Sequence, residues 1–231
     1  MRMRPTRLIA AVVSLALLIA GLIALFGGGP GSVTPKVDDA EIARTAPDYV
    51  KYCAACHGLD GHTVADSIAP NLASDDVLAL ASDDFLRAAI AKGRPGADGL
   101  GAKGVKMPGF AKAETGPLDD DTIDALVGYV RQWQVGPPVV LDDGYKAAGD
   151  VAAGEAVYAR ACASCHGQGG WGDQAPRLAG AVFQASASDD FIRQTVRRGR
   201  AGTTMRPIAL APDEEDALIA YIRTFAPTAP R

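Results

Sequence analysis

Two short stretches of the chain combine thiols and an imidazole at a spacing that suits one kind of covalent chemistry. Residues 53–57 read Cys-Ala-Ala-Cys-His, and residues 162–166 read Cys-Ala-Ser-Cys-His. The reactive side chains are those of Cys53, Cys56, His57, Cys162, Cys165 and His166. C-x-x-C-H is the attachment signature of a c-type haem, in which two thiols form thioethers and the histidine binds the iron. Because the two motifs use all four cysteines of the chain, we expect two covalently bound haem c groups.

Two other kinds of site also use paired cysteines. Two C-x-x-C pairs can hold one zinc ion, but zinc modules keep the pairs within roughly 15–20 residues of each other. Here the pairs lie more than a hundred residues apart. A thioredoxin-like disulfide accompanies alternating strands and helices, and no such pattern surrounds either motif. Neither alternative requires a histidine directly after the second cysteine, so covalent haem is the preferred interpretation.

The sequence around the motifs also occurs twice. The stretch Ala-Ser-Asp-Asp-Phe begins at residue 81 and again at residue 187. The interval from Pro70 to Gly96 is 26 residues, as is the interval from Pro176 to Gly202. This equal spacing predicts two copies of one domain. The expected segments are a cytoplasmic tip and anchor at 1–26, a tether at 27–45, domains at 46–135 and 150–231, and a linker at 136–149.

The local pattern predicts helices and no strands. Ser82 and Ser188 are expected helix N-caps, because each precedes two aspartates that the helix dipole favours in the first turn. Gly93 and Gly199 are the expected stops. The last helix of each copy is expected to begin at 119–121 and at 212–213. We therefore predict an all-α fold, with an N-terminal transmembrane helix followed by two tandem domains, each a few helices wrapped round a covalent haem.

The N-terminal segment is apolar and long enough to cross a membrane. Residues 8–26 carry no charge and follow three arginines. As a helix they would be about 28 Å long, close to the ~30 Å core of a bilayer. A cleaved signal peptide has a shorter apolar core, of roughly 7–15 residues, and a small-x-small cleavage site. We therefore favour a retained single-pass anchor in the inner membrane, with the arginines in the cytoplasm and the remaining chain in the periplasm.

A histidine-bound haem iron needs a ligand on its other face, and that ligand separates an electron carrier from a catalyst. Beyond residue 45 the sequence has two methionines, Met107 and Met205, one per copy in a glycine-rich loop near a proline. A thioether suits haem iron, and His/Met ligation raises the potential. We expect Met107 to bind opposite His57, and Met205 opposite His166. His62 is expected to be a solvated loop residue, with a rearranged ligand as the alternative.

These residues resemble class I cytochrome c, present in duplicate over residues 46–135 and 150–226. The plan is similar to that of cytochrome c4 and of the dihaem subunits of respiratory complexes. The resemblance implies that the carbonyls of Pro70 and Pro176 accept a hydrogen bond from the proximal imidazole of their own copy. It also implies a crossing of the first and last helices at a glycine and an aromatic residue, which Gly154 and Tyr221 match. At the position of that glycine the first copy has Thr45.

The expected function is electron transfer by a membrane-anchored dihaem protein that is not itself an enzyme. The expected partners are a redox donor and an acceptor, such as a quinol-oxidising complex and a terminal oxidase or reductase. Arg94 and Arg200 occupy matching places and are candidates to pair with haem propionates. The alternatives are a peroxidase-like catalyst or an oxidoreductase subunit with one open iron, and a redox or gas sensor. The net charge of −4 gives no support to nucleic-acid binding.

Overall fold

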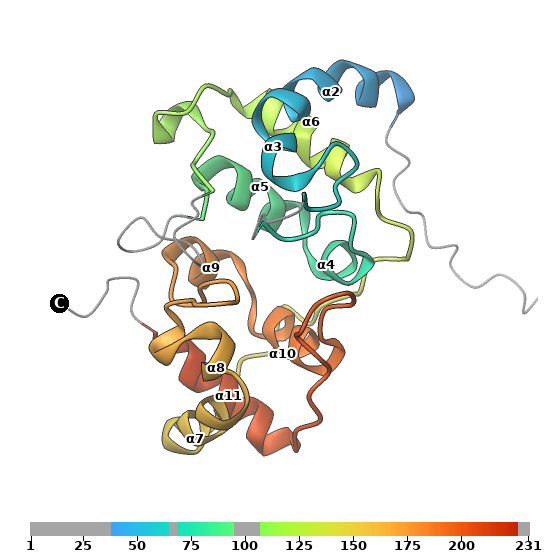
Figure 1. The fold of residues 1–231 in the computed structure, drawn as a ribbon. Coiled ribbons are helices and arrows are strands. Elements are labelled where there is room, and N and C mark those ends of the chain that lie inside the picture. The colour runs from blue at the N-terminus through green and yellow to red at the C-terminus, as the bar shows by residue number, and fades with distance from the viewer. Residues whose placement is uncertain (1–37, 65–68, 95–106, 226–231) are drawn as a thin grey trace, which may run out of the picture. The chain divides into compact units, whose positions relative to one another are not determined.

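The computed structural model describes residues 38–64, 69–94 and 107–225, which form helices joined by loops (Figure 1). They belong to one compact unit, Thr34–Arg231. Within these described ranges, regular secondary structure is helical, and β pairing is limited to two isolated bridges. The all-α prediction is confirmed to that extent. The predicted membrane helix at 8–26 lies outside the described residues, and among those described no helix is long and apolar enough to span a bilayer.

The helices follow the same order in each repeat. The first repeat contains α2 (Asp39–Tyr52), α3 (Ala54–His57), α4 (Asp75–Leu80), α5 (Asp83–Lys92), the 3₁₀ turn η2 (Lys112–Glu114) and α6 (Asp120–Arg131). The second contains α7 (Val151–Ala161), α8 (Ala163–His166), the 3₁₀ turn η3 (Gln168–Gly170), α9 (Ala181–Ser186), α10 (Asp189–Arg198) and α11 (Pro212–Arg223). Each repeat therefore has a first helix, a one-turn motif helix, two middle helices and a last helix.

The middle helices begin and end where the sequence predicts. The hydroxyl of Ser82 accepts a hydrogen bond from the backbone N–H of Phe85 at 3.1 Å, and the hydroxyl of Ser188 accepts one from Phe191 at 3.0 Å. Such bonds satisfy backbone donors that the first helical turn leaves free. Gly93 and its counterpart in the second repeat are the C-caps of α5 and α10. The starts predicted for the last helices agree with α6 and α11.

The first helix begins inside the segment that the sequence assigns to the tether. Helix α2 starts at Asp39, and the carboxylate of Asp38 accepts a hydrogen bond from the N–H of Ala40 at 3.1 Å. Asp39 and Glu41 lie in the first turn, where the helix dipole favours acids. The tether predicted at 27–45 was therefore wrong for residues 39–45, because the N-cap lies inside the Asp-rich stretch assigned to the tether.

The first and last helices of each repeat pack against each other, as the resemblance implies. Helix α7 contacts α11, and α2 contacts α6. A Cβ added to Gly154 would lie 1.9 Å from the carbonyl oxygen of Ala217 and 2.8 Å from the Cβ of Tyr221. The close approach of α7 and α11 therefore requires a glycine. In α2, Thr45 is 4% exposed, so the first repeat buries a side chain at the matching position.

Each repeat has its own hydrophobic core. Aromatic residues four positions apart, one in each last helix and one just beyond its end, contribute to both cores, as ring contacts of Tyr129 with Trp133 at 5.5 Å and of Tyr221 with Phe225 at 5.1 Å show. The largest fully buried apolar side chains are those of Tyr49, Leu78, Ile123 and Leu126 in the first core, and of Leu80, Tyr158, Leu218 and Ile219 in the second. The two cores follow the two sequence copies except at Leu80 of α4, which belongs to the first repeat and packs into the second core.

An arginine at the end of each last helix joins it to the middle of its repeat. The Nε of Arg131 donates to the carboxylate of Asp83 at 2.8 Å, and the Nε of Arg223 donates to that of Asp189 at 2.6 Å. Each guanidinium also donates to a backbone carbonyl two residues before that aspartate. Because a guanidinium presents several donors in a fixed plane, one side chain fixes the last helix against the start of α5 or α10.

The linker predicted at 136–149 is not helical, but hydrogen bonds hold it to both repeats. The N–H of Val139 donates to the carbonyl of Ala79 at 2.7 Å, in the first repeat. The N–H of Asp142 donates to the carboxylate of Asp190 at 2.8 Å, in the second. The absence of helix follows from its prolines and glycines. The attachment depends on tertiary contacts that the composition does not reveal.

Candidate haem sites

The motif cysteines and histidines lie on one-turn helices that continue the first helix of each repeat. The N–H of Cys53 donates to the carbonyl of Tyr49 at 2.8 Å, and the N–H of His57 donates to the carbonyl of Cys53 at 2.9 Å. In the second repeat, Cys162 and His166 make the same two bonds at 2.8 and 2.9 Å. Each motif therefore holds two sulfurs and one imidazole within about one helical turn, which is the spacing that the C-x-x-C-H attachment signature requires.

A buried tyrosine anchors the residue that follows each motif. The hydroxyl of Tyr49 donates to the carbonyl of Gly58 at 2.8 Å, and that of Tyr158 donates to the carbonyl of Gly167 at 2.7 Å. Burial raises the pKa of both tyrosines, so the hydroxyls stay protonated and can donate. Sequence reasoning missed this pair. The signal was available, since a tyrosine stands four residues before the first cysteine in both copies.

Each proximal histidine has one ring nitrogen fixed by a proline carbonyl. The distance from Nδ1 of His57 to the carbonyl oxygen of Pro70 is 3.0 Å, and from Nδ1 of His166 to that of Pro176 it is 2.8 Å. Because a carbonyl can only accept, Nδ1 carries the proton and Nε2 keeps its lone pair for a metal. Burial lowers the pKa of both imidazoles, which favours this neutral form. The hydrogen bond that the resemblance implied is confirmed in both repeats.

The cysteines do not resemble redox-active thiols. All four are free in the structure, and burial raises the pKa of Cys53 and of Cys162 to about 11. Catalytic or redox C-x-x-C pairs instead have a lowered thiol pKa. The environment therefore favours cysteines that serve as attachment points over a thioredoxin-like pair.

The two methionines occupy equivalent loops. The carbonyl of Met107 accepts a hydrogen bond from the N–H of Arg94 at 2.8 Å, and the carbonyl of Met205 accepts one from the N–H of Arg200 at 2.8 Å. In both repeats the bond lies just beyond the glycine that ends the middle helix. The structure thus places one thioether per repeat at matching points of the fold, and ligation by these sulfurs stays a prediction.

The arginines of these loops provide a test of whether a haem suits the residues present. The guanidinium of Arg94 lies over the ring of Phe85 at 4.7 Å, and burial lowers its pKa to about 10. Its Nη1 is buried and has no hydrogen-bond partner within the described ranges. A buried cationic donor without an acceptor is costly. A haem carries two carboxylates, so the cofactor fits the unsatisfied group in the first repeat.

The remaining predicted residues are placed as follows. Arg200 donates from Nη1 to the carbonyl of Asp76 at 2.8 Å and from Nη2 to the hydroxyl of Thr195 at 2.9 Å, so its guanidinium already has protein partners. His62 is exposed in a loop, with its Nδ1 3.3 Å from the amide nitrogen of Asn71, as predicted.

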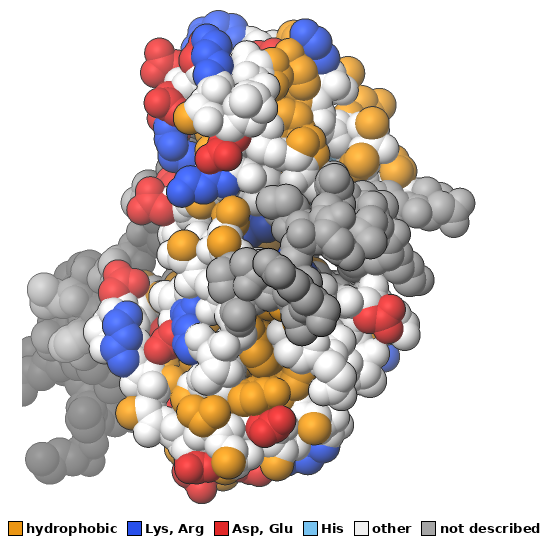
Figure 2. Space-filling view, turned by 90° about the vertical axis from the view of Figure 1, so that its left-hand side faces the viewer, with side chains coloured by type: hydrophobic (Ala, Val, Ile, Leu, Met, Phe, Trp, Pro, Cys, Tyr) orange, Lys and Arg blue, Asp and Glu red, His pale blue; other side chains and the backbone are white. Residues whose placement is uncertain are grey.

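Figure 2 shows hydrophobic side chains gathered on one face of the second repeat, in the lower part of the view.

Two surface pockets lie away from the motifs. One, of about 510 Å³, lies between the start of α4 and the linker, and the other, of about 610 Å³, lies between α5 and α9. Neither is lined by a cysteine, a histidine or a methionine. The candidate ligands are therefore defined by the motif helices and the methionine loops.

Comparison with protein families identifies the sequence pattern. Residues 40–130 and 149–222 match the family model described as cytochrome C oxidase, cbb3-type, subunit III. The cbb3-type cytochrome c oxidase subunit FixP of Bradyrhizobium diazoefficiens is 33% identical over 153 residues, which cover 65% of this chain and 49% of the relative. Subunit CcoP of an Azospirillum species is 33% identical over 160 residues, covering 65% and 50%. The chain thus spans about half the length of these relatives.

A solved structure supports the fold. The chain is similar to the reducing HAO-like protein complex of Kuenenia stuttgartiensis, with a TM-score of 0.50 and 18% sequence identity. The similarity covers 83% of this chain and 97% of that chain. At this level of identity the match carries information about the fold alone.

Proposed function

Since the chain belongs to the cbb3-type cytochrome c oxidase subunit III family, and is therefore a c-type cytochrome, we propose that it is a dihaem electron-transfer subunit of a terminal oxidase. The observation that carries this proposal is the repetition of one ligand arrangement. Both repeats have a C-x-x-C-H helix, an imidazole held by a proline carbonyl, and a methionine loop hydrogen-bonded to an arginine.

The residues of the chain would divide the work of holding each haem. In the first repeat, Cys53 and Cys56 would anchor the cofactor, and His57 and Met107 would bind its iron. The carbonyl of Pro70 keeps the imidazole oriented and its Nδ1 protonated.

In the second repeat Cys162, Cys165, His166, Met205 and Pro176 take the same parts. When bound, each haem supplies an iron that cycles between Fe(II) and Fe(III). Because the histidine and the methionine of each repeat would both bind the iron, no substrate would need to coordinate it, which suits a carrier.

The proposed location is the periplasmic side of the inner membrane. The apolar segment at 8–26 would tether the haem domains, and a tether raises their effective concentration at partners in the same membrane. The proposed acceptor is the catalytic part of a cbb3-type oxidase, because the relatives are oxidase subunits by name. The proposed donor is a quinol-oxidising complex or a carrier that it reduces.

Purification from the native membrane tests the assignment to an oxidase. The full-length protein, extracted in mild detergent, is expected to co-purify with the other subunits of the oxidase, and its haems are expected to be oxidised when oxygen is added. Recovery of a fully occupied dihaem protein without any oxidase subunit, and without oxidation by the isolated oxidase, would contradict the proposal.

The second candidate function is catalysis at an open iron. It would require one methionine to leave its iron. Carbon monoxide binding to the ferrous holoprotein distinguishes the two, since an iron with two strong protein ligands is expected to bind the gas weakly. Rapid, stoichiometric binding at one haem would favour the catalytic alternative over the carrier.

A further inference from the structure

The two repeats contact each other through equivalent helices. Helix α4 packs against α10, and α5 packs against α9, where α4 corresponds to α9 and α5 to α10. Phe85 and Phe191, which occupy the same position in α5 and α10, stack at a centroid distance of 4.6 Å. The interface therefore has approximate two-fold symmetry, and any chemical difference between its two halves is informative.

One half of the interface reaches the loop of Met205. Asp76 is the second residue of α4, in the first repeat. Its carboxylate accepts a hydrogen bond from the N–H of Ala201 at 2.6 Å, and its backbone carbonyl accepts one from Nη1 of Arg200 at 2.8 Å. A single residue of the first repeat thus binds two consecutive residues of the second.

Arg200 and Ala201 begin a short loop in which both the N–H and the carbonyl of Met205 are hydrogen-bonded. The N–H of Arg200 donates to the carbonyl of Met205 at 2.8 Å. The hydroxyl of Thr203 donates to the carbonyl of Arg200 at 2.8 Å and accepts from the N–H of Met205 at 3.1 Å. Because these three hydrogen bonds join Arg200, Thr203 and Met205 in a ring, a displacement of Arg200 and Ala201 must displace the backbone of Met205.

Among the described residues, the other half of the interface shows no equivalent of this connection. The second residue of α9 is Val182, the equivalent of Asp76 in α4. A valine side chain has no hydrogen-bonding atom, so it cannot accept a hydrogen bond as the carboxylate of Asp76 does. The Nη1 of Arg94 has no hydrogen-bond partner in the described part of the chain, whereas the guanidinium of Arg200 has two. Within the described residues, the link observed therefore runs from α4 of the first repeat to the Met205 loop of the second.

We propose that Asp76 is a positioning residue for the axial methionine of the second haem, so that the iron–sulfur bond in the second repeat depends on the first repeat. The proposal rests on the proposed dihaem function. It adds a residue that lies in one repeat and acts on the ligand of the other.

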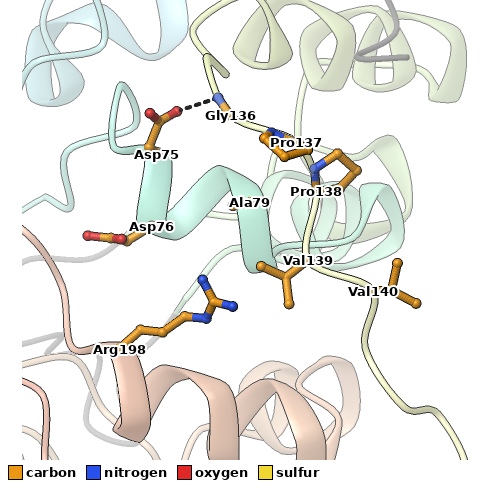
Figure 3. Close-up of a pocket in the computed structure, with 9 residues that line it drawn as sticks. All are labelled: Asp75, Asp76, Ala79, Gly136, Pro137, Pro138, Val139, Val140 and Arg198. Carbon is orange, nitrogen blue, oxygen red and sulfur yellow. Dashed lines mark hydrogen bonds between the residues drawn. The ribbon is translucent and has the colours of Figure 1, made fainter. Parts of the chain in front are cut away.

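The chain offers a matched control at the neighbouring residue. Figure 3 shows Asp75 and Asp76 at the start of α4, with their carboxylates pointing in different directions. Asp75 accepts hydrogen bonds from the N–H groups of Val135 and Gly136 at 2.8 and 3.2 Å, so it binds the end of its own repeat. Removing either side chain deletes one charge at the same end of the same helix, but only Asp76 contacts the Met205 loop.

The test compares D76A, D76N and D75A in the full-length holoprotein. Redox titration resolves the two haems, and the charge-transfer absorption of sulfur-bound ferric haem reports ligation. M107H and M205H assign each signal to its repeat. D76A is expected to lower the potential of the second haem alone, because losing sulfur ligation favours ferric iron. It should also raise the fraction of that ferric haem lacking sulfur by about tenfold, the order expected for one charged hydrogen bond.

The conservative variant separates positioning from charge. The amide oxygen of Asn can still accept from Ala201, so D76N is expected to keep sulfur ligation near the wild-type level, and D75A should match wild type in the second haem. T203V breaks the loop from within the second repeat and is expected to produce the same change as D76A. If T203V changes the second haem while D76A leaves it as in wild type, or if D76A alters both haems equally, the proposal is overturned.

Failure of the proposed function has a different signature. If wild-type protein lacks sulfur-bound ferric haem in the second repeat, M205H causes no loss of sulfur–iron absorption. That result removes the ligand on which the inference depends, and it does so before Asp76 is altered. A normal wild-type spectrum with an unaffected D76A variant overturns only the role of Asp76.

Discussion

Replacement of Gly199 by alanine should damage the second methionine loop in a way that can be worked out from the backbone. Gly199 ends α10 with φ +67° and ψ −156°, a region that is essentially restricted to glycine and costs other residues about 1–3 kcal/mol. A Cβ at this position would lie 2.6 Å from the carbonyl oxygen of Met205 and 2.6 Å from the nitrogen of Pro207. Both contacts are with backbone atoms, so rotation of a side chain cannot relieve them.

The clash adds a second cost to the strain. Overpacking in a well-packed region costs about 1–3 kcal/mol, so the G199A substitution is expected to destabilise the native state by about 2–6 kcal/mol in total. That is a large part of the roughly 5–15 kcal/mol by which a folded protein is stable. Because the atom that must move is the carbonyl of Met205, loss of iron–sulfur ligation should precede global unfolding.

Two glycines of the second repeat serve as controls. Gly202 has φ +74° but no atom within 4 Å of an added Cβ, so G202A introduces strain without a clash. Gly180 has neither a positive φ nor a neighbour within 4 Å. Guanidinium titration of the holoprotein can be followed by far-UV circular dichroism and by the sulfur–iron absorption. The unfolding midpoint should be highest for G180A, lower for G202A and lowest for G199A. Equal midpoints for G199A and G180A would refute the reasoning.

Three further substitutions test other parts of the sites. Y158F leaves the carbonyl of Gly167 without its buried donor, so it should lower the free energy of unfolding, measured with denaturant, by about 1–3 kcal/mol. An unchanged unfolding midpoint would contradict a stabilising role for this hydrogen bond. R94Q removes a buried cation beside the first methionine loop, so the potential of the first haem should fall by on the order of tens of millivolts in redox titration, whereas a rise would contradict the account. Hydrogen bonds from the hydroxyl and N–H of Thr122 hold the pKa of Asp119 at about 2. A lowered native pKa gives stability that is present above the unfolded pKa of about 3.9 and lost as the pH falls toward 2. D119N should accordingly show a shallower loss of stability than wild type between about pH 4 and pH 2. Parallel acid-unfolding curves would argue against a stabilising role for the carboxylate of Asp119, the N-cap of α6.

The features that the sequence predicts well are those with a local cause. Ser82 and Ser188 cap their helices because a hydroxyl followed by two acids satisfies the free N–H groups of a first turn, whatever surrounds it. Gly93 ends α5 for an equally local reason, since the chain turns there with φ +71°. The two motifs and the repeat spacing are likewise visible without tertiary information.

Features that depend on contacts between distant segments were not predictable in the same way. The interaction of Arg131 with Asp83 joins residues 48 positions apart, and nothing in the spacing selects this aspartate from its neighbours. The interaction of Asp76 with Ala201 spans 125 positions and depends on how the repeats pack. The early start of α2 is an intermediate case, because Asp38 is a recognisable cap that follows a stretch rich in glycine and proline.

The tyrosines before the motifs show how a pattern can be present and still be missed. Tyr49 and Tyr158 stand at the same distance before their first cysteine, yet tyrosine at a helix end is ordinarily assigned to core packing. Their hydroxyl bonds to Gly58 and Gly167 depend on the turn that follows the motif. That turn becomes apparent only once the backbone is known.

The central claim is that each repeat binds one haem covalently, and the intact mass of the mature protein tests it most directly. Protein purified from its native membrane should exceed the mass of its polypeptide by two haems, and by one haem when either C-x-x-C pair is replaced by alanines. A mature protein with the mass of the bare polypeptide, or one that retains two haems after either replacement, would contradict the account.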